Sequence, residues 1–216
     1  INKVIINNNH KKNALLQSII INPKDEMHIY VGLSIGGVFE SKDDGKTWKS
    51  LNSGLDSKKK SKTINNSFSL ALNSLSPTYL FQQNSLGIFR LNNESSKWTH
   101  IGNNLPKDIG DFGFSISIHP LDPNTIWVFP MENNETFSQI SPGGQPALYC
   151  SQDAGDSWFR QDIGLPMRNA WFTVKEKCLS TDCMNNTGVY FGTTSGSIWM
   201  SDNEGNSWRQ IAVHLP

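Results

Sequence analysis

An eight-residue pattern recurs three times in this chain and constrains its fold more than any other feature. The three copies occupy residues 41–48, 151–158 and 201–208, and each begins with Ser and closes with Trp. An eroded fourth copy at 91–98 keeps an Asn at its third position and the closing Trp. The closing tryptophans, at positions 48, 98, 158 and 208, are therefore 50, 60 and 50 residues apart. This period is typical of the blades of a β-propeller rather than of a helical solenoid.

Each copy has the chemistry of a tight turn between two strands. Asp or Asn at the third position can accept hydrogen bonds from the backbone N–H groups that follow, and Gly at the fifth supplies a positive φ angle. The closing Trp offers a large apolar surface to a neighbouring blade. We therefore assign a structural role to these residues: Ser41, Asp43, Gly45, Trp48, Asn93, Trp98, Ser151, Asp153, Gly155, Trp158, Ser201, Asn203, Gly205 and Trp208.

The pattern S-x-D-x-G-x-[ST]-W resembles the Asp box of the bacterial neuraminidase repeat (BNR), and the chain resembles sialidase-like β-propellers. From about residue 17 onward it is similar to prokaryotic BNR-repeat propellers, which are often labelled exo-sialidase or glycosyl hydrolase from the repeat alone. Segments 118–123 and 188–193 are typical of that group. The resemblance implies an all-β fold, a β-propeller of four-stranded antiparallel blades. It implies no agreed activity.

The stretches between the octapeptides are in phase with them. Short apolar runs at 18–21, 69–72 and 115–118 predict innermost strands, and similar runs at 37–39, 87–89, 147–149 and 197–199 predict third strands. We expect blades at about 14–54, 64–105, 113–165 and 169–216, in a single propeller domain or a portion of one.

Four blades lie at the lower limit for a closed propeller. The favoured interpretation is a portion of a larger, six- to eight-bladed propeller, with residues 1–13 as a remnant of a preceding blade. A closed four-bladed ring is the alternative. An unclosed propeller exposes strand edges, which predicts association through those edges.

Composition argues against two classes of partner, nucleic acid and the membrane. The chain has 19 basic and 19 acidic side chains, so its net charge of zero gives no electrostatic footprint for nucleic acid or an anionic membrane. No segment approaches the roughly 18 apolar residues of a membrane span, which predicts a soluble chain without membrane insertion. No signal peptide is visible in this segment, and the compartment is unknown.

The cysteines and histidines indicate no metal and no cofactor. Cys150, Cys178 and Cys183 have no CxxC spacing, and the five histidines are scattered. Cys178 and Cys183 either close a small disulfide loop or remain two free thiols, and the sequence favours neither alternative.

A ligand is expected on the face opposite the octapeptide turns, where the links between blades and the loops after the second strands lie. One such loop, 131–146, belongs to a blade that spans 31 residues from Trp127 to Trp158, where the first blade spans 18 from Tyr30 to Trp48, an excess of 13. It is either a functional loop or a tolerated insertion.

Polar side chains are expected to gather on the same face and to form a rim. Uncharged amides with an aromatic side chain and an occasional ion pair suit a sugar or a peptide backbone better than a phosphate. Ordinary solvated loop residues are the alternative. The candidate ligand-binding residues are Gln82, Gln83, Asn84, Asp108, Asp111, Glu132, Arg168, Asn169 and Trp171.

The catalytic residues of sialidases do not carry over to this segment. The resemblance would imply three substrate-binding arginines, but we expect Arg90, Arg160 and Arg209 on outer strands or near the octapeptide turns, which leaves only Arg168. A glycosidase with two carboxylates is another enzymatic possibility. The available carboxylates would be Asp108, Asp111, Glu132 and Glu135.

The sequence therefore predicts a non-catalytic binding or scaffold propeller that recognises a glycan or a protein on the face opposite the octapeptide turns. The alternative is a glycoside hydrolase, either sialidase-like or of the two-carboxylate type.

Overall fold

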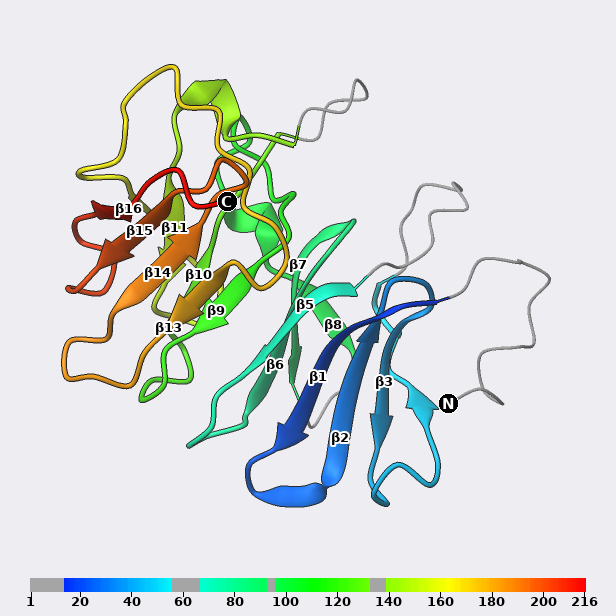
Figure 1. The fold of residues 1–216 in the computed structure, drawn as a ribbon. Coiled ribbons are helices and arrows are strands. Elements are labelled where there is room, and N and C mark those ends of the chain that lie inside the picture. The colour runs from blue at the N-terminus through cyan, green and yellow to red at the C-terminus, as the bar shows by residue number, and fades with distance from the viewer. Residues whose placement is uncertain (1–13, 56–66, 93–95, 133–138) are drawn as a thin grey trace.

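The computed structural model describes residues 14–55, 67–92, 96–132 and 139–216, and these residues form four antiparallel sheets of four strands each (Figure 1). The first sheet contains β1 (Leu16–Asn22), β2 (Asp25–Leu33), β3 (Gly37–Ser41) and β4 (Lys49–Ser50). The second contains β5 (Ser67–Leu72), β6 (Tyr79–Asn84), β7 (Gly87–Asn92) and β8 (Trp98–His100). The third contains β9 (Ile116–Ile118), β10 (Ile126–Val128), β11 (Leu148–Ser151) and β12 (Phe159–Gln161). The fourth contains β13 (Leu179–Thr181), β14 (Val189–Gly192), β15 (Ile198–Ser201) and β16 (Arg209–Ala212).

Each sheet is an up-and-down meander in which neighbouring strands follow one another in the chain. The only helical segments among the described residues are two short 3-10 turns, η1 (Gly102–Asn104) and η2 (Pro142–Gly144). This architecture confirms the predicted all-β propeller of four-stranded blades. The strands predicted from apolar runs lie in or overlap β1, β5 and β9 and also β3, β7, β11 and β15.

The hydrophobic core lies between sheets rather than within them. Tyr30 and Val38 of the first sheet pack with Leu80 and Trp98 of the second. Two further clusters fill the junctions between the second and third sheets and between the third and fourth. In Figure 1 the first and fourth sheets lie at opposite ends of the row, so the described residues form an open arc of blades and not a closed four-bladed ring.

The octapeptide turns are held by hydrogen bonds between the same positions in all three copies. In the third blade, the Ser151 hydroxyl donates to Asp153 Oδ1 over 2.8 Å and accepts from the Gly155 N–H over 2.7 Å. The other end of the turn is closed by Asp153, whose carboxylate accepts from the N–H and the hydroxyl of Ser157. The turn at Ser41 repeats this arrangement. The turn at Ser201 differs in one bond, because the side-chain amide of Asn203 donates to the Ser207 hydroxyl instead of accepting from it.

Two successive residues of each turn have positive φ angles. Gly45, Gly155 and Gly205 have φ angles of 77°, 100° and 85°, as the glycine at the fifth position predicts. The residue before each glycine is also left-handed, although it is not glycine: φ is 59° at Asp44, 58° at Ala154 and 59° at Glu204. The sequence did not reveal this second position.

Backbone hydrogen bonds define which loops share a face. The N–H groups of Asp44, Ala154 and Glu204 donate to the carbonyls of Met27, Asn124 and Thr187, respectively. The octapeptide turns therefore lie on the same face as the hairpins between the first and second strands of each blade. We call the opposite face the loop face; it carries the loops between second and third strands and the links between sheets.

The closing tryptophans join consecutive blades. The indole N–H of Trp98 donates to the carbonyl of Leu51 in the first blade, and that of Trp158 donates to Ile101 in the second over 3.2 Å. Trp208 is 5% exposed and packs in the cluster between the third and fourth sheets. Trp48 differs, because its indole N–H donates to the carbonyl of Gly45 in its own turn.

The second blade, which contains the eroded copy of the octapeptide, is connected by Arg90 to the octapeptide turn of the third blade. Asn93 lies outside the described residues, whereas Trp98 is buried, as is Trp208 of the fourth blade. Arg90, on β7, donates to the carbonyl of Ala154 over 2.9 Å and forms an ion pair with Asp156 over 3.2 Å. Its guanidinium also lies over the ring of Tyr79. Arg90 thus ties the second blade to the octapeptide turn of the third blade.

The three cysteine thiols are free in the structure. Cys178 and Cys183 are exposed, which agrees with the alternative of two unpaired thiols. Cys150 is buried, and burial raises the pKa of its thiol to about 12, so this thiol stays protonated at neutral pH.

We predict that Gly164→Ala destabilises the junction between the third and fourth blades. Gly164 has a φ angle of 91°, and a Cβ atom there would lie 2.2 Å from the carbonyl oxygen of Trp208. The expected loss in the free energy of unfolding is about 1–2 kcal/mol from the left-handed backbone and a further ~1–3 kcal/mol from the clash. Urea denaturation measures it. Gly110→Ala is the matched control, because Gly110 has a φ of 73° with open space around its Cβ position; equal losses in the two variants would contradict the proposed clash.

We also predict that the octapeptide turns contribute to acid unfolding. Hydrogen bonds from Thr47 lower the pKa of Asp43 to about 2. Partial burial raises the pKa of Asp153, but hydrogen bonds from Ser157 and Ser151 outweigh it and the net pKa is lowered. Because the folded pKa lies below the unfolded value of 3.8, this stability is present above about pH 4 and is lost as the pH falls toward about 2.

The variant Asp43→Asn/Asp153→Asn should lose less stability than the wild type between pH 4 and pH 2, as followed by urea midpoints. Asn is compatible with the turn, because Asn203 occupies the same position in the fourth blade and donates to Ser207. Asp44→Asn, which removes a charge from the first turn, serves as the control. An unchanged pH profile in the double variant would refute this origin of the acid sensitivity.

Candidate functional site

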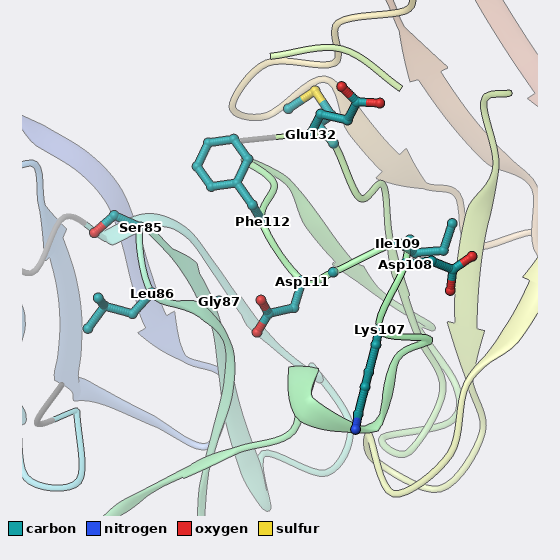
Figure 2. A pocket seen from close by; sticks show the side chains of 11 residues that line it. Ser85, Leu86, Gly87, Lys107, Asp108, Ile109, Asp111, Phe112 and Glu132 are labelled. Atoms are coloured by element: carbon teal, nitrogen blue, oxygen red, sulfur yellow. The ribbon is translucent and has the colours of Figure 1, made fainter. Parts of the chain in front are cut away.

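A pocket of about 370 Å³ opens on the loop face between the second and third blades (Figure 2). Three segments line it: the β6–β7 turn at 85–87, the link between the second and third sheets at 107–112, and residues 131–132 after β10. The pocket therefore lies on the face where the sequence predicts a ligand. Asp108, Asp111 and Glu132 of the predicted ligand-binding residues line it, together with Lys107.

Asp111 occupies a socket built from two glycines and a histidine. Its Oδ2 atom lies 2.5 Å from Nε2 of His100. A Cβ atom would lie 2.0 Å from this oxygen if placed at Gly87 and 2.3 Å if placed at Gly102. The absence of side chains at these two glycines therefore makes room for the carboxylate. The imidazole of His100 is itself held by stacking on Phe89, with ring centroids 4.5 Å apart.

The side chain of Gln83 bonds to two of the segments that line the pocket, the β6–β7 turn and the link at 107–112. Its side-chain amide donates to the backbone carbonyl of Asp111 over 3.0 Å and to that of Gly87 over 3.3 Å. Gln83 is 1% exposed. It therefore positions the pocket rather than presenting its own amide on the surface.

Gln82 and Asn84 are also buried, at 0% and 1% exposure, and do not form part of an exposed rim. They extend from β6 toward the first sheet, because they alternate with Phe81 and Gln83, which face the third. Three side chains at this junction have buried polar atoms with no hydrogen-bond partner among the described residues: Ser67, Gln82 and Asn84. The hydroxyl of Ser85, at the pocket, also has none. Whether these amides contact a ligand remains a prediction.

Glu132 links the pocket to the long loop of the third blade. Its Oε1 atom accepts the backbone N–H of Gly143 over 2.8 Å. Residues 133–138 of that loop, including Glu135, lie outside the described residues. The rest of the loop packs on the link before the fourth blade, where the predicted residues Arg168, Asn169 and Trp171 are exposed.

The remaining arginines lie where the sequence places them. Arg160 on β12 pairs with Asp162 over 2.7 Å, and Arg209 on β16 lies 4.0 Å from Asp202. Arg90 reaches an octapeptide turn. Arg168 is thus the one arginine among the described residues that lies in a link on the loop face.

A second, smaller pocket of about 190 Å³ contains Glu40 and Tyr30. The Glu40 carboxylate is already surrounded by His28 at 3.1 Å, Lys42 at 3.7 Å and Lys49 at 4.0 Å. Burial, followed by the nearby carboxylates, raises the pKa of Tyr30 to about 12. The charges of this pocket are compensated internally, which makes it a weaker candidate for ligand binding.

Two negative findings apply to the described part of the chain only. No group of three or more His, Cys, Asp and Glu side chains there could hold a metal ion. No helix within it is sufficiently long and apolar to cross a membrane.

Comparison with known proteins establishes the fold. No protein-family model and no curated protein matches the chain. Among solved structures, the chain is similar to an ancestral GH74 enzyme, with 20% identity and a TM-score of 0.64 over 91% of this chain. It is also similar to a GH74 xyloglucanase from Xanthomonas campestris (16% identity, TM-score 0.62, 89% of this chain) and to YCF48 from Cyanidioschyzon merolae (13%, 0.61 and 93%).

The chain spans only part of each of these structures: 24% of the ancestral enzyme, 30% of the xyloglucanase and 57% of YCF48. The four blades therefore match only a portion of each of these proteins. At such identities the likeness shows the propeller fold and leaves the ligand open.

We predict that Gly102→Ala displaces Asp111 from its socket and costs about 1–3 kcal/mol of the free energy of unfolding. The φ angle of Gly102 is accessible to alanine, so the cost comes from the contact with Asp111. Adding Asp111→Gly should recover most of the loss, a coupling that a double-mutant cycle measures. Gly192→Ala is the control, because open space surrounds that Cβ position at an ordinary φ angle. A loss that Asp111→Gly fails to relieve would argue against the socket.

Proposed function

We propose that this propeller segment is a non-catalytic binding or scaffold module that receives a glycan or a protein in the pocket on the loop face. The pocket combines Lys107, Asp108, Asp111 and Glu132 with the apolar side chains of Leu86 and Phe112. Such a mixture of apolar surface and a few directed polar groups is typical of ligand sites.

The observation that carries the proposal is the direction of the carboxylates. In Figure 2 the side chains of Asp108, Asp111 and Glu132 point away from one another and not toward one point of the pocket. Two of them are already bound within the chain, Asp111 by His100 and Glu132 by the Gly143 N–H. A glycosidase needs two carboxyl groups that face a single bond from opposite sides. This arrangement favours binding over hydrolysis.

We also propose that the octapeptide turns are Asp boxes and that the chain is part of a sialidase-like propeller. Three observations support it: the hydrogen bonds between the same positions in three copies, the positive φ at the fourth and fifth positions, and the indole bonds between consecutive blades. On this assignment the boxes are structural, since they lie on the face away from the pocket.

A glycoside hydrolase is the second candidate. It is favoured by the number of carboxylates at the pocket and by the similarity of fold to two GH74 enzymes. On this alternative, residues outside the four blades would complete the catalytic set.

The full-length protein separates the two candidates. We expect no release of reducing ends from xyloglucan, mixed-linkage β-glucan or sialyllactose. We also expect binding to members of a glycan array or a displayed peptide library, weakened at least tenfold by Asp108→Asn/Asp111→Asn, since the loss of one hydrogen bond to a charged group costs about 1.5–3 kcal/mol. Asp44→Asn, an exposed carboxylate on the octapeptide turn, is the matched control. Hydrolysis that the double variant abolishes would establish the enzyme instead.

A further inference from the structure

Trp171 is an exposed aromatic side chain on a firmly anchored stretch of backbone. It is 55% exposed. Its neighbours on both sides are bound to the loop of the third blade. The Ala170 N–H donates to the Gly144 carbonyl over 2.9 Å, and the Phe172 N–H donates to the Ser141 hydroxyl over 3.0 Å. The Ser141 hydroxyl in turn donates to the Ala170 carbonyl over 2.6 Å.

The indole ring rests against a residue that has no side chain. A Cβ atom at Gly144 would lie 3.1–3.2 Å from three atoms of the six-membered ring of Trp171. The backbone of Gly144 therefore supports one side of the ring, while more than half of the side chain remains in contact with solvent. A side chain fixed in this way loses little conformational entropy when a ligand packs on it.

The supported ring is connected to the pocket described above through Glu132. Glu132 lines the pocket and accepts the N–H of Gly143, the residue before Gly144. Arg168 and Asn169, both exposed, precede Trp171 in the same link. The link that carries this ring therefore also carries an exposed amide and an exposed guanidinium, and the loop that supports the ring is bonded to the carboxylate of Glu132.

We propose that Trp171 is a stacking platform for a pyranose ring of a glycan whose neighbouring sugar units reach the pocket at Asp111. A pyranose presents one flat face of C–H groups to an indole and a periphery of hydroxyl groups to polar side chains, which is the combination this surface offers. The inference rests on the proposed binding function and specifies its ligand class as a glycan. A protein partner is the alternative that the experiment distinguishes.

The test uses the full-length protein and soluble hexasaccharides of glucose, xylose, mannose and N-acetylglucosamine, with affinity measured by isothermal titration calorimetry. Trp171→Ala should weaken binding of the preferred hexasaccharide roughly tenfold, whereas Trp171→Phe, which keeps a flat ring, should stay within about threefold. Phe159→Ala is the matched control, because Phe159 is 56% exposed on β12 and should leave affinity unchanged. Equal thermal midpoints for the variants would exclude a folding defect.

Each other outcome has a distinct meaning. Hexasaccharide binding that survives Trp171→Ala but is lost in Asp108→Asn/Asp111→Asn overturns the platform and retains the binding function. No hexasaccharide binding, together with a library-selected peptide whose binding requires Trp171, overturns the glycan inference and retains the binding function. The absence of binding to every hexasaccharide and every peptide overturns both.

Discussion

The structure depends on the junction between consecutive blades, where a closing tryptophan meets the backbone of the blade before it. The indole N–H of Trp98 or Trp158 donates to a carbonyl three residues after the preceding tryptophan, at Leu51 or Ile101. The ring itself fills the hydrophobic cluster between the two sheets, so polar pairing and apolar burial coincide. No sheet of four short strands could bury both of its faces alone, and this repeated junction supplies the missing layer.

The parts of the fold that could be predicted from sequence are those that short-range chemistry determines. The turn from Ser151 to Trp158 closes through its own side chains, and Asn73 and His119 accept backbone N–H groups two and three residues on. The site could be predicted only in outline, because its key contacts join distant residues. Nothing in the spacing of Gly87, His100 and Gly102 indicates that they surround Asp111. Gln82 and Asn84 lie at the end of a strand, where the sequence predicts an exposed rim. They are buried because the first sheet packs against the second, which the sequence does not reveal.

The loop face brings together a carboxylate and an aromatic ring that are held in place by different parts of the chain. Gln83 and the two glycines fix Asp111 from below, whereas Trp171 is fixed from the side by the loop of the third blade. The long loop, which the sequence left open as functional or merely tolerated, thus forms one wall of the pocket through Glu132 and the support of the tryptophan ring through Gly144. These contacts hold Asp111, Glu132 and Trp171 in one arrangement, which lowers the entropy that a ligand binding to this face would cost.

The bond that Trp48 makes within its own turn has a consequence for the outer face of the first blade. That face exposes Leu16, Ile19 and Ile21, at 54%, 59% and 57%. Because the Trp48 N–H already has the Gly45 carbonyl as its acceptor, the face carries no unpaired indole donor that would demand a partner. A sheet that packs there would exchange one hydrogen bond for another at almost no net gain. Its docking energy would come from covering the aliphatic side chains, and it would therefore vary with temperature and added salt in the manner of the hydrophobic effect.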